Sequence, residues 1–246
     1  MRRFFISKDM LSDGNAVITG NLFRHMAKSL RLKTGTKISL TDEDGCCYLG
    51  LISGIGRESL TVSVEKTVPE PDGGTGPRIT LYQALPKGGK MEFILQKGTE
   101  LGVFEIVPFV AGRSIPRLTK DREAERLERW RRVVREAARQ SNRPVFPDIH
   151  PVMDFPDILS CSAQSVKLLL WEKEKSNGLK RILTDLPVPE SVAVMVGPEG
   201  GLTQEEAETA IAGGFIPVTL GRRILRTETA PIAVLAIIQF FWGDMG

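Results

Sequence analysis

The sequence holds few of the residues that build disulfide frameworks or metal sites. Among its 246 residues are three cysteines and two histidines. Cys46 and Cys47 are adjacent and Cys161 is distant, which is neither a disulfide pattern nor a metal-ligand spacing. His25 and His150 each stand far from a second suitable ligand. We therefore expect no metal site, zinc included, and a reducing, cytoplasmic environment.

Long apolar runs are also missing. The start, MRRFFISKDM, carries two arginines but no apolar stretch of signal-peptide length. The most apolar segment, Ala230 to Trp242, is too short to cross a bilayer and predicts a buried helix, so no membrane association is expected. The share of 41% hydrophobic and 26% charged residues is typical of a soluble globular protein. A net charge of +3 permits an anionic partner without requiring one.

The first part of the chain has the pattern of a small β-rich domain. Short candidate strands alternate with turns, and Asp44-Gly45 is typical of a tight hairpin turn in which Gly45 adopts a positive φ. One helix is expected between Leu22 and Leu30. The segment from Val68 to Pro77 is rich in proline and glycine, lacks periodicity and predicts a linker. The candidate strands are Val17 to Ile18, Lys37 to Leu40, Cys47 to Ile52 and Leu60 to Val64.

The pattern changes after the linker, where apolar runs alternate with helical stretches. This alternation favours the α/β class, with a parallel sheet that helices cover on both faces. Thr203 and Glu206 have the spacing of a capping box, and Gly213-Gly214 would end the helix that they begin. The candidate strands are Ile79 to Leu85, Phe104 to Val110, Val166 to Trp171, Val192 to Val196 and Ile216 to Leu220. The candidate helices are Met91 to Leu101, Arg122 to Gln140, Thr203 to Ala212 and Pro231 to Trp242.

The last of these helices, PIAVLAIIQFFW, is apolar on nearly every side. Pro231 suits its first turn, where a missing N–H takes no intrahelical hydrogen bond away. A helix of this kind has to be covered all round. Burial within one chain and burial at a dimer interface are both open from the sequence.

Two glycine-bearing polar segments follow predicted strands and precede predicted helices. The first, Val196 to Gly201, reads VGPEGG, and its glycines would let a ligand approach main-chain amides. The second, Leu220 to Ala230, reads LGRRILRTETA and crowds arginines, threonines and a glutamate into a short connection. Each also has a simpler interpretation, a tight strand-to-helix turn for the first and a solvated loop for the second. Parallel strands would place both segments at one sheet edge, where ligands bind in such folds, so we interpret the pair as a binding site.

Basic side chains gather in the first domain and along one predicted helix. In the helix from Arg122 to Arg139, acidic residues could neutralise the arginines through pairs on the same face. The cluster in the first domain has fewer acids beside it, and a nucleic-acid surface there is a hypothesis. The residues of that cluster are Arg2, Arg3, Arg24, His25, Lys28, Arg31 and Lys33.

Several segments, taken in order, resemble one known family along the whole chain. GPEGG, followed after one helix and one strand by LGRRILRTETAP, resembles the signature of the SPOUT methyltransferases. RRFFI, HMAKSLRLKTGTKISLTDEDG, ALPKGGKMEFILQKGTELGV and EAARQSNRPVFPDI extend the likeness to the RsmE family of 16S ribosomal RNA uridine-N3 methyltransferases. Multiple motifs in the right order make this match more specific than a single glycine-rich loop.

The resemblance implies an α/β fold in two domains. It implies a PUA-like β-barrel that binds RNA over residues 1–70, a linker over 71–77, and a SPOUT methyltransferase domain with a C-terminal trefoil knot over 78–246. It also implies S-adenosyl-L-methionine as cofactor and a homodimer formed through the knotted domain. The implied reaction is methyl transfer to N3 of one uridine of 16S ribosomal RNA in the small ribosomal subunit. That uridine has to be unpaired or splayed, because N3 is buried in a Watson–Crick pair.

Carried over motif by motif, the resemblance suggests residues for each role. Arg226 is the candidate cation that stabilises the uracil anion, and Glu228 is a candidate for accepting the N3 proton. Capping of the last helix or pairing with Arg223 are also open roles for Glu228. The residues expected to bind RNA are Arg2, Arg3, Arg24, Lys28 and Arg31. The residues expected to bind the cofactor are Leu170, Trp171, Glu172, Val196, Gly197, Pro198, Glu199, Gly200, Leu220, Gly221, Ile224, Leu225 and Arg226.

Two other functions stay open at this point. A SPOUT enzyme that methylates a ribose 2′-hydroxyl would share the two loop motifs, although the front domain and the RRFF start argue against it. A non-enzymatic RNA-binding or ribosome-assembly factor would need no cofactor. Tight binding of S-adenosylhomocysteine would count against that second alternative.

Overall fold

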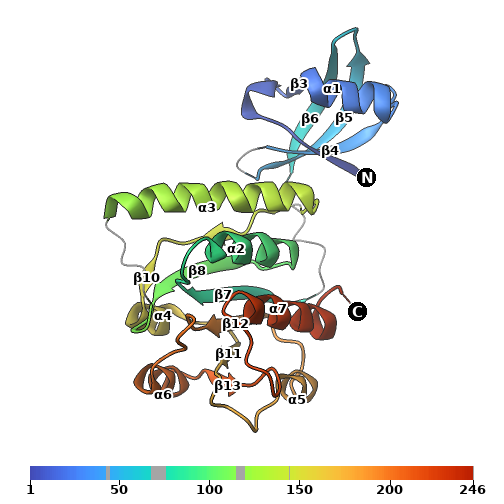
Figure 1. Cartoon of the computed structure of the whole chain (residues 1–246). Helices are drawn as coiled ribbons and strands as arrows, with labels where there is room; N and C mark the ends of the chain where they lie inside the picture. The colour runs from blue at the N-terminus through green and yellow to red at the C-terminus, as the bar shows by residue number, and fades with distance from the viewer. Residues whose placement is uncertain (43–44, 68–75, 115–119, 144, 246) are drawn as a thin grey trace. The chain divides into compact units, whose positions relative to one another are not determined.

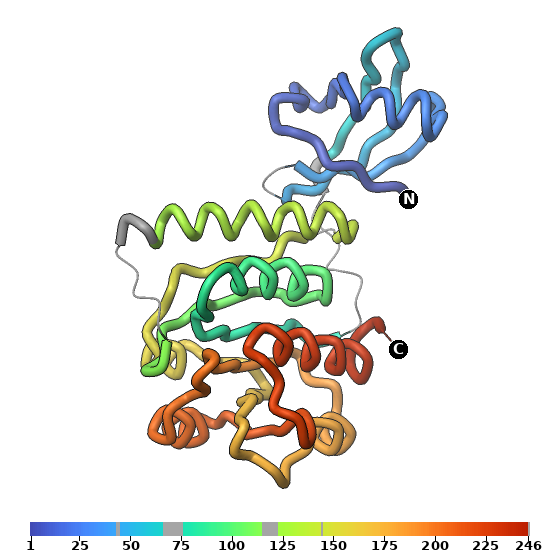
Figure 2. The backbone as a smooth tube through the Cα atoms, viewed as in Figure 1, coloured from blue at the N-terminus to red at the C-terminus, as the bar shows by residue number. Residues whose placement is uncertain are grey.

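The computed structural model describes residues 1–42, 45–67, 76–114, 120–143 and 145–245 (Figure 1, Figure 2). The chain divides into two compact units. The first consists of Met1–Asp72 and Asn142–Val145, and the second of Gly73–Ser141 and Phe146–Gly246. The short segment Asn142–Val145 therefore groups with the first unit, although the second unit surrounds it in the sequence.

The first unit is built on a sheet that has six strands among the described residues, in the order β1-β4-β5-β6-β3-β2. β1 runs parallel to β4, and the other neighbouring pairs are antiparallel. Alternate residues point inward, as in β3, where Ala16 and Ile18 are fully buried and Val17 between them is exposed. The strands are β1 (Arg2–Phe5), β2 (Leu11–Ser12), β3 (Asn15–Thr19), β4 (Lys37–Thr41), β5 (Cys47–Ile55) and β6 (Ser59–Thr67).

The strands predicted for this unit are confirmed. β3, β4, β5 and β6 contain the four expected segments, whereas the sequence pattern did not indicate β1 and β2. Gly45 has the expected positive φ, at 82°. Its neighbour Asp44, and residues 68–75 of the expected linker, lie outside the described residues.

The single helix expected in this unit takes a different form. A four-residue helix, α1 (Gly20–Phe23), continues directly into a π-helix, η2 (Arg24–Ser29). The wider π turn ends where the amide of Leu30 donates to the carbonyl of His25 at 2.9 Å. It buries Met26 in the core of the unit, and the polar side chains before and after Met26 stay at the surface.

The second unit contains a sheet in which all seven strands found among the described residues are parallel. Their order is β10-β8-β7-β12-β11-β13, with β9 also paired to β8. The strands are β7 (Arg78–Ala84), β8 (Glu105–Val110), β9 (Asp148–Ile149), β10 (Met153–Asp154), β11 (Val166–Leu170), β12 (Ser191–Val196) and β13 (Ile216–Val218). The helices are α2 (Lys90–Glu100), α3 (Lys120–Gln140), α4 (Phe155–Cys161), α5 (Leu179–Asp185), α6 (Gln204–Ala212) and α7 (Thr229–Trp242).

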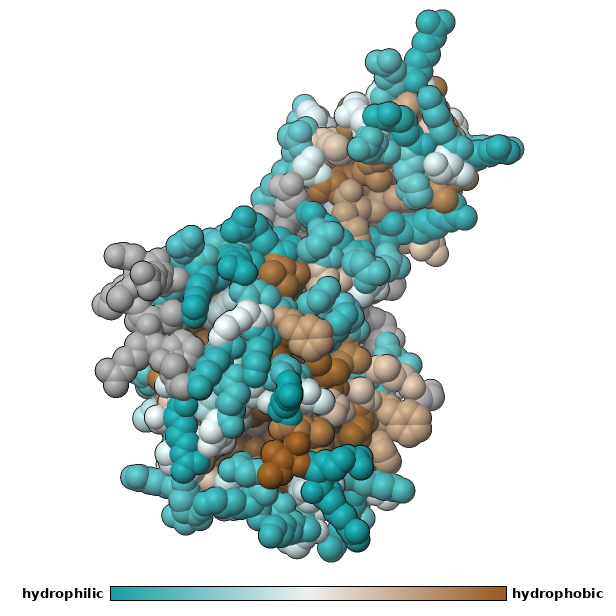
Figure 3. All heavy atoms as spheres, in the orientation of Figure 1, coloured by the Kyte–Doolittle hydropathy of each residue, from teal (hydrophilic) through white to brown (hydrophobic). Residues whose placement is uncertain are grey.

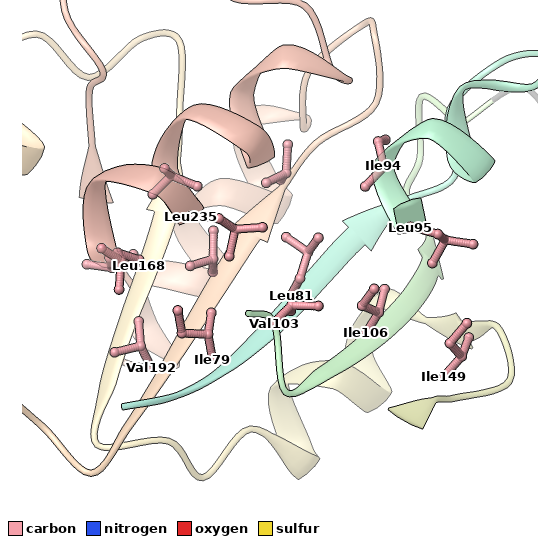
Figure 4. Packing of buried hydrophobic residues seen from close by; sticks show 14 of the residues in the cluster. Ile79, Leu81, Ile94, Leu95, Val103, Ile106, Ile149, Leu168, Val192 and Leu235 are labelled. Atoms are coloured by element: carbon pink, nitrogen blue, oxygen red, sulfur yellow. The ribbon is translucent and has the colours of Figure 1, made fainter. Parts of the chain in front are cut away.

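Both faces of this sheet are buried, as the alternation of strands and helices along the chain predicts. Leu168 and Leu169 are consecutive in β11 and fully buried, yet Leu168 belongs to the hydrophobic core that includes residues of α2, α3, α5 and α7, and Leu169 to the core that includes residues of α4 and α6. Val192 and Ala193 in β12 divide in the same way. Figure 4 shows part of the core that contains Leu168, where Leu235 of α7 lies on the same side of the sheet as Leu168 and Val192. Strands that are buried on both faces need continuous apolar runs, which is why their sequence signal is strong.

The helices expected in the second unit are confirmed, close to the predicted residues. The capping box of α6 is present, because the amide of Glu206 donates to Thr203 Oγ1 at 3.1 Å and the amide of Thr203 donates to Glu206 Oε2 at 2.8 Å. Gly213 follows α6 as its C-cap. The sequence pattern did not indicate α4 and α5, which have seven residues each and are too short for a clear helical period.

The last helix, α7, is covered on one side within the unit. Leu235 and Ile238 are fully buried, and the indole N–H of the buried Trp242 donates to the carbonyl of Leu183 at 3.1 Å. In contrast, Phe240 on the other side is 61% exposed. Figure 3 shows apolar atoms at the surface of the second unit, on the face that carries α7 in Figure 1. Within the described part of the chain, no helix is long and apolar enough to span a membrane.

Candidate functional site

The carboxyl ends of three neighbouring strands meet at one edge of the second unit's sheet. β11 lies between β12 and β13, and its last residue, Leu170, pairs with Val196 on one side and with Val218 on the other. The three strands therefore end at the same level. Because they are parallel, the segments that follow them emerge together, as expected for the two glycine-bearing motifs.

These segments enclose a cavity of about 990 Å³. That volume suits a small-molecule ligand, and the wall combines apolar side chains, glycines and charged side chains. No cluster of metal-ligand side chains occurs among the described residues. Every residue that the resemblance assigned to the cofactor lies in the cavity wall: Leu170, Trp171, Glu172, Val196, Gly197, Pro198, Glu199, Gly200, Leu220, Gly221, Ile224, Leu225 and Arg226.

The first motif needs glycine for local reasons. The amide of Gly201 donates to the carbonyl of Pro198 at 2.9 Å and closes a tight turn. Gly201 has a φ of 67°, in the left-handed region that favours glycine. A Cβ on Gly197 would lie 3.1 Å from the amide nitrogen of Leu202, so even alanine would crowd the backbone there. The turn thereby brings main-chain atoms of residues 197–201 into the cavity wall.

Side chains from distant parts of the sequence hold this turn. Arg113, which follows β8, donates from Nη1 to the carbonyl of Gly200 at 2.8 Å. Thr227, in the second motif, donates from Oγ1 to the carbonyl of Gly197 at 2.8 Å. The turn is therefore tied both to the end of another strand and to the other motif.

Lys90, the first residue of α2, contacts two carboxylates. Its Nζ lies 2.9 Å from Glu199 Oε1 and 3.1 Å from Glu228 Oε2. The backbone amide of Lys87 adds a hydrogen bond of 3.1 Å to Glu199 Oε1. Desolvation acts to raise the pKa of each glutamate, but Lys90 and nearby backbone donors hold both pKa values below the ordinary value. The hydrogen bond to Glu199 in turn raises the pKa of Lys90, so all three groups are charged near neutral pH.

Two buried polar atoms at the site have neither a hydrogen-bond partner nor an ion-pair partner within the described residues. Trp171, in the cavity wall, buries its indole N–H without an acceptor. Gln83, fully buried in β7, donates to Thr227 Oγ1 at 3.3 Å, but its Oε1 receives no hydrogen bond. Because buried polar atoms nearly always have partners, these two are atoms that water or a ligand can satisfy.

The two residues considered for catalysis differ in their surroundings. Arg226 is exposed and lines the cavity. Glu228 does not belong to the described residues that line it. Glu228 pairs with Lys90 rather than Arg223, and its side chain makes no capping hydrogen bond to α7. The two alternative roles suggested for Glu228 are therefore wrong, because the fold brings the start of α2 beside it. A carboxylate with a lowered pKa is also a weak base.

The residues expected to bind RNA all lie in the first unit. Arg24 and Lys28 belong to the π-helix η2, and Arg31 follows it with a φ of 51°. Arg3 is half-buried, and its Nη1 donates to the carbonyl of Asn142 at 3.1 Å, so this side chain is engaged within the unit. The exposed members of the set are Arg2, Arg24, Lys28 and Arg31.

Comparison with known proteins identifies the family. Residues 75–239 match the RNA methyltransferase domain, and residues 18–65 match the RNA methyltransferase PUA domain. Ribosomal RNA small subunit methyltransferase E of Bacillus subtilis (strain 168) is 32% identical over 248 residues, covering 98% of this chain and 96% of that protein. The chain belongs to the ribosomal RNA small subunit methyltransferase E family.

Solved structures agree with this family. Ribosomal RNA small subunit methyltransferase E from Neisseria gonorrhoeae, bound to S-adenosyl methionine, is 32% identical, with a TM-score of 0.74 and 100% of each chain covered. A methyltransferase from Legionella pneumophila in complex with the bound cofactor SAM is 27% identical, with a TM-score of 0.73 and 98% of each chain covered. The predicted family, with its methyltransferase and PUA domains, is thereby confirmed.

Four residues that tie the segments around the cavity together were not predicted from the sequence: Gln83, Lys90, Arg113 and Thr227. Lys90 had a local signal, because a cation in the first turn of a helix opposes the helix dipole and so needs another reason to be there. Gln83 had one too, as a polar residue in an apolar strand. Arg113 had none, since its contact with Gly200 depends on how two distant strand ends meet.

Proposed function

We propose that this chain transfers a methyl group from S-adenosyl-L-methionine to N3 of one uridine of 16S ribosomal RNA. The observation that carries the proposal is the cavity in the second unit, because the segments after β11, β12 and β13 form it and both family motifs line it. The relative in Bacillus subtilis is named as a methyltransferase of small-subunit ribosomal RNA, and the Neisseria gonorrhoeae structure holds S-adenosyl methionine. We assign the same cofactor and the same class of RNA to this chain.

The residues of the cavity fit this cofactor. Apolar side chains such as Leu170 and Leu225 can cover an adenine ring, and the main chain around Gly197 and Gly200 can bind its polar atoms. The unpartnered indole N–H of Trp171 can donate to an acceptor of the ligand. When bound, the cofactor supplies a methyl group on a positively charged sulfur, which a nitrogen nucleophile can attack.

The chain's own residues have two tasks at the uracil ring. N3 of uridine carries a proton and is a poor nucleophile until that proton leaves. We assign Arg226 to stabilise the resulting anion, because its guanidinium stays charged and lies in the cavity wall. The second task is to hold N3 within about 3–3.5 Å of the carbon that it attacks.

Glu228 suits proton acceptance poorly in this arrangement. Its ion pair with Lys90 and its lowered pKa make it a weak base. We therefore assign stabilisation of the uracil anion to Arg226, and the N3 proton passes to solvent water as that anion forms. Arg226→Ala is expected to slow single-turnover methylation by about 10²–10³-fold, as for loss of an anion-stabilising donor, and Glu228→Gln by much less. A larger loss in Glu228→Gln than in Lys90→Met, which breaks the same ion pair, would restore Glu228 as the proton acceptor.

The finer features of the fold belong to the same proposal. We assign residues 1–70 to a PUA-like RNA-binding barrel, 71–77 to a linker, and 78–246 to a SPOUT domain with a trefoil knot around the cavity. RNA binding by the first unit rests on its exposed basic residues, which would hold phosphates and position a splayed uridine. These residues are Arg2, Arg24, Lys28 and Arg31.

A homodimer formed through α7 is also part of the proposal. Phe240 is 61% and Phe241 36% exposed, and their ring centroids lie 5.6 Å apart in an edge-to-face arrangement. Exposed aromatic side chains that adjoin a buried helix face are typical of protein–protein interfaces. A second copy would cover the side of α7 that its own unit leaves exposed.

Methylation of small ribosomal subunits that lack the modification tests the proposal, with naked 16S RNA as a parallel substrate. Nucleoside mass spectrometry is expected to show 3-methyluridine, and the two substrates show whether assembled structure is needed. A 2′-O-methyl nucleoside would keep the cofactor and overturn the base assignment. A protein that binds the cofactor but transfers nothing to either substrate would act on another RNA, and one that binds no cofactor would be an assembly factor.

A further inference from the structure

Lys90 contacts both motif loops of the cavity but belongs to neither. Its Nζ lies 2.9 Å from Glu199 in the first motif and 3.1 Å from Glu228 at the end of the second. The side chain of Lys90 is 34% exposed, that of Glu199 27% and that of Glu228 17%. Because one ammonium holds both carboxylates, the two loops cannot separate at this point without breaking an ion pair.

We propose that Lys90 is a positioning residue for methyl transfer, which joins the two motif loops and thereby places Arg226 in the cavity wall. This inference rests on the function proposed above. The carbonyl of Arg226 accepts hydrogen bonds of 2.9 Å from the amides of Thr229 and Ala230, so its backbone is fixed to the first turn of α7. A shift of Glu228, which lies inside that turn, would therefore displace Arg226 as well.

A cation is needed at this position for an electrostatic reason. Without Lys90, the carboxylates of Glu199 and Glu228 would lose the cation that forms an ion pair with each of them. Their oxygens would be close enough for like-charge repulsion, which pushes the two loops apart. The pKa values of both glutamates are lowered and that of Lys90 is raised, as mutual stabilisation of the three charges requires.

The loops have a second link, which is independent of Lys90. Thr227 is buried, and its hydroxyl donates to the carbonyl of Gly197 at 2.8 Å. Loss of the Lys90 charge is therefore expected to loosen the loops around Glu199 and Glu228 without unfolding the unit. A lysine in the first turn of α2 also opposes the dipole of that helix, so its removal should not weaken α2 itself.

Three variants separate positioning from general stability. Lys90→Met removes the charge, Lys90→Arg keeps it, and Lys97→Met is a matched control on the same helix. Lys97 is also 34% exposed and also forms an ion pair, of 2.8 Å with Glu100, but it contacts neither motif loop in any ion pair found among the described residues. All three proteins are measured as the full chain, first by amide exchange without ligand and then by calorimetry with S-adenosylhomocysteine.

In Lys90→Met, we expect the backbone amides of residues 199–201 and 221–229 to exchange hydrogen about tenfold faster than in the wild type. Cofactor binding should weaken by a similar factor. The single-turnover methylation rate at saturating cofactor should fall as well, because Arg226 is displaced. Lys90→Arg should recover most of each loss, and Lys97→Met should match the wild type. A merely structural role would instead lower the melting temperature and leave the rate at saturating cofactor unchanged.

Unchanged exchange of both loops in Lys90→Met would overturn the inference, as would a Lys90→Arg variant as defective as Lys90→Met. Failure of the proposed function looks different, because the wild type itself would then transfer no methyl group to ribosomal RNA. The exchange comparison needs no substrate and no cofactor. The exchange comparison therefore tests whether Lys90 holds the two loops together even if the wild type transfers no methyl group.

Discussion

Replacement of Gly201 by alanine is expected to act on stability and on cofactor binding through separate mechanisms. Gly201 has a φ of 67°, and a residue with a Cβ in this region costs about 1–2 kcal/mol. Each kcal/mol corresponds to about 2–4 °C of melting temperature in a unit of this size. The new Cβ would also lie 2.5 Å from Glu172 Oε1, so this flexible carboxylate would have to leave its place in the cavity wall. We expect the dissociation constant of S-adenosylhomocysteine to rise about tenfold, equivalent to about 1.4 kcal/mol.

Gly200→Ala is the matched control for this prediction. Gly200 lacks the positive φ, and the atoms nearest to a Cβ there belong to the side chain of Arg113, at an ordinary 3.4 Å. Thermal unfolding and isothermal titration calorimetry on both variants measure the two effects. In a Glu172→Ala background, Gly201→Ala should still lower stability but should weaken cofactor binding no further. Equal affinity losses at positions 200 and 201, or an affinity loss at 201 that persists without Glu172, would refute the reasoning.

Three further predictions concern other parts of the molecule. His150 Nε2 lies 2.9 Å from Glu105 Oε2, which raises the pKa of His150 above 6.5 and lowers the pKa of Glu105 below 4.5. The ion pair therefore contributes its full stabilisation of the fold between pH 4.5 and 6.5. This stabilisation is lost as the pH rises through the folded pKa of His150 or falls through the folded pKa of Glu105. Urea unfolding should show a loss of stability for His150→Gln near about pH 5.5 that fades as the pH rises above the folded pKa of His150, and a loss that stays constant into alkaline solution would contradict this. Reversal of charge at Arg24 and Arg31 to glutamate should weaken RNA binding most at low salt and leave cofactor affinity unchanged, because both lie in the first unit. An equal loss of cofactor affinity would show that the division of roles is wrong. Phe240→Asp puts a charge on the exposed side of α7 and should turn a dimer into a monomer in light scattering, whereas an unchanged dimer would place the interface elsewhere.

The local features of the second unit could be predicted because short stretches of sequence determine them. Consecutive apolar residues such as Leu168 and Leu169 indicate a strand that is buried on both faces. The capping box of Thr203 and Glu206 involves groups only three positions apart. The family motifs added the prediction that the two loops bind a cofactor, which composition and periodicity alone left open.

The first unit shows where local pattern was not enough. Apolar spacing around Met26 predicts an α-helix, but the chain forms the π-helix η2 (Arg24–Ser29) there. Propensity is a weak preference, and the packing of Met26 into the core of the unit decides the turn. β1 was missed because its residues, RRFF, do not alternate between polar and apolar and so lack the pattern of a half-buried strand.

The sequence alone predicts most of the strands, the longer helices and the common position of the two motif loops, because side-chain period, turn chemistry and the direction of parallel strands are local properties. Only the tertiary structure decided which distant groups meet at the cavity. Lys90 reaches Glu199 and Glu228, Arg113 reaches the carbonyl of Gly200, and no spacing in the sequence indicates either contact. Ion pairs and hydrogen bonds form only over about 3 Å, so they depend on how whole elements pack rather than on the residues beside them.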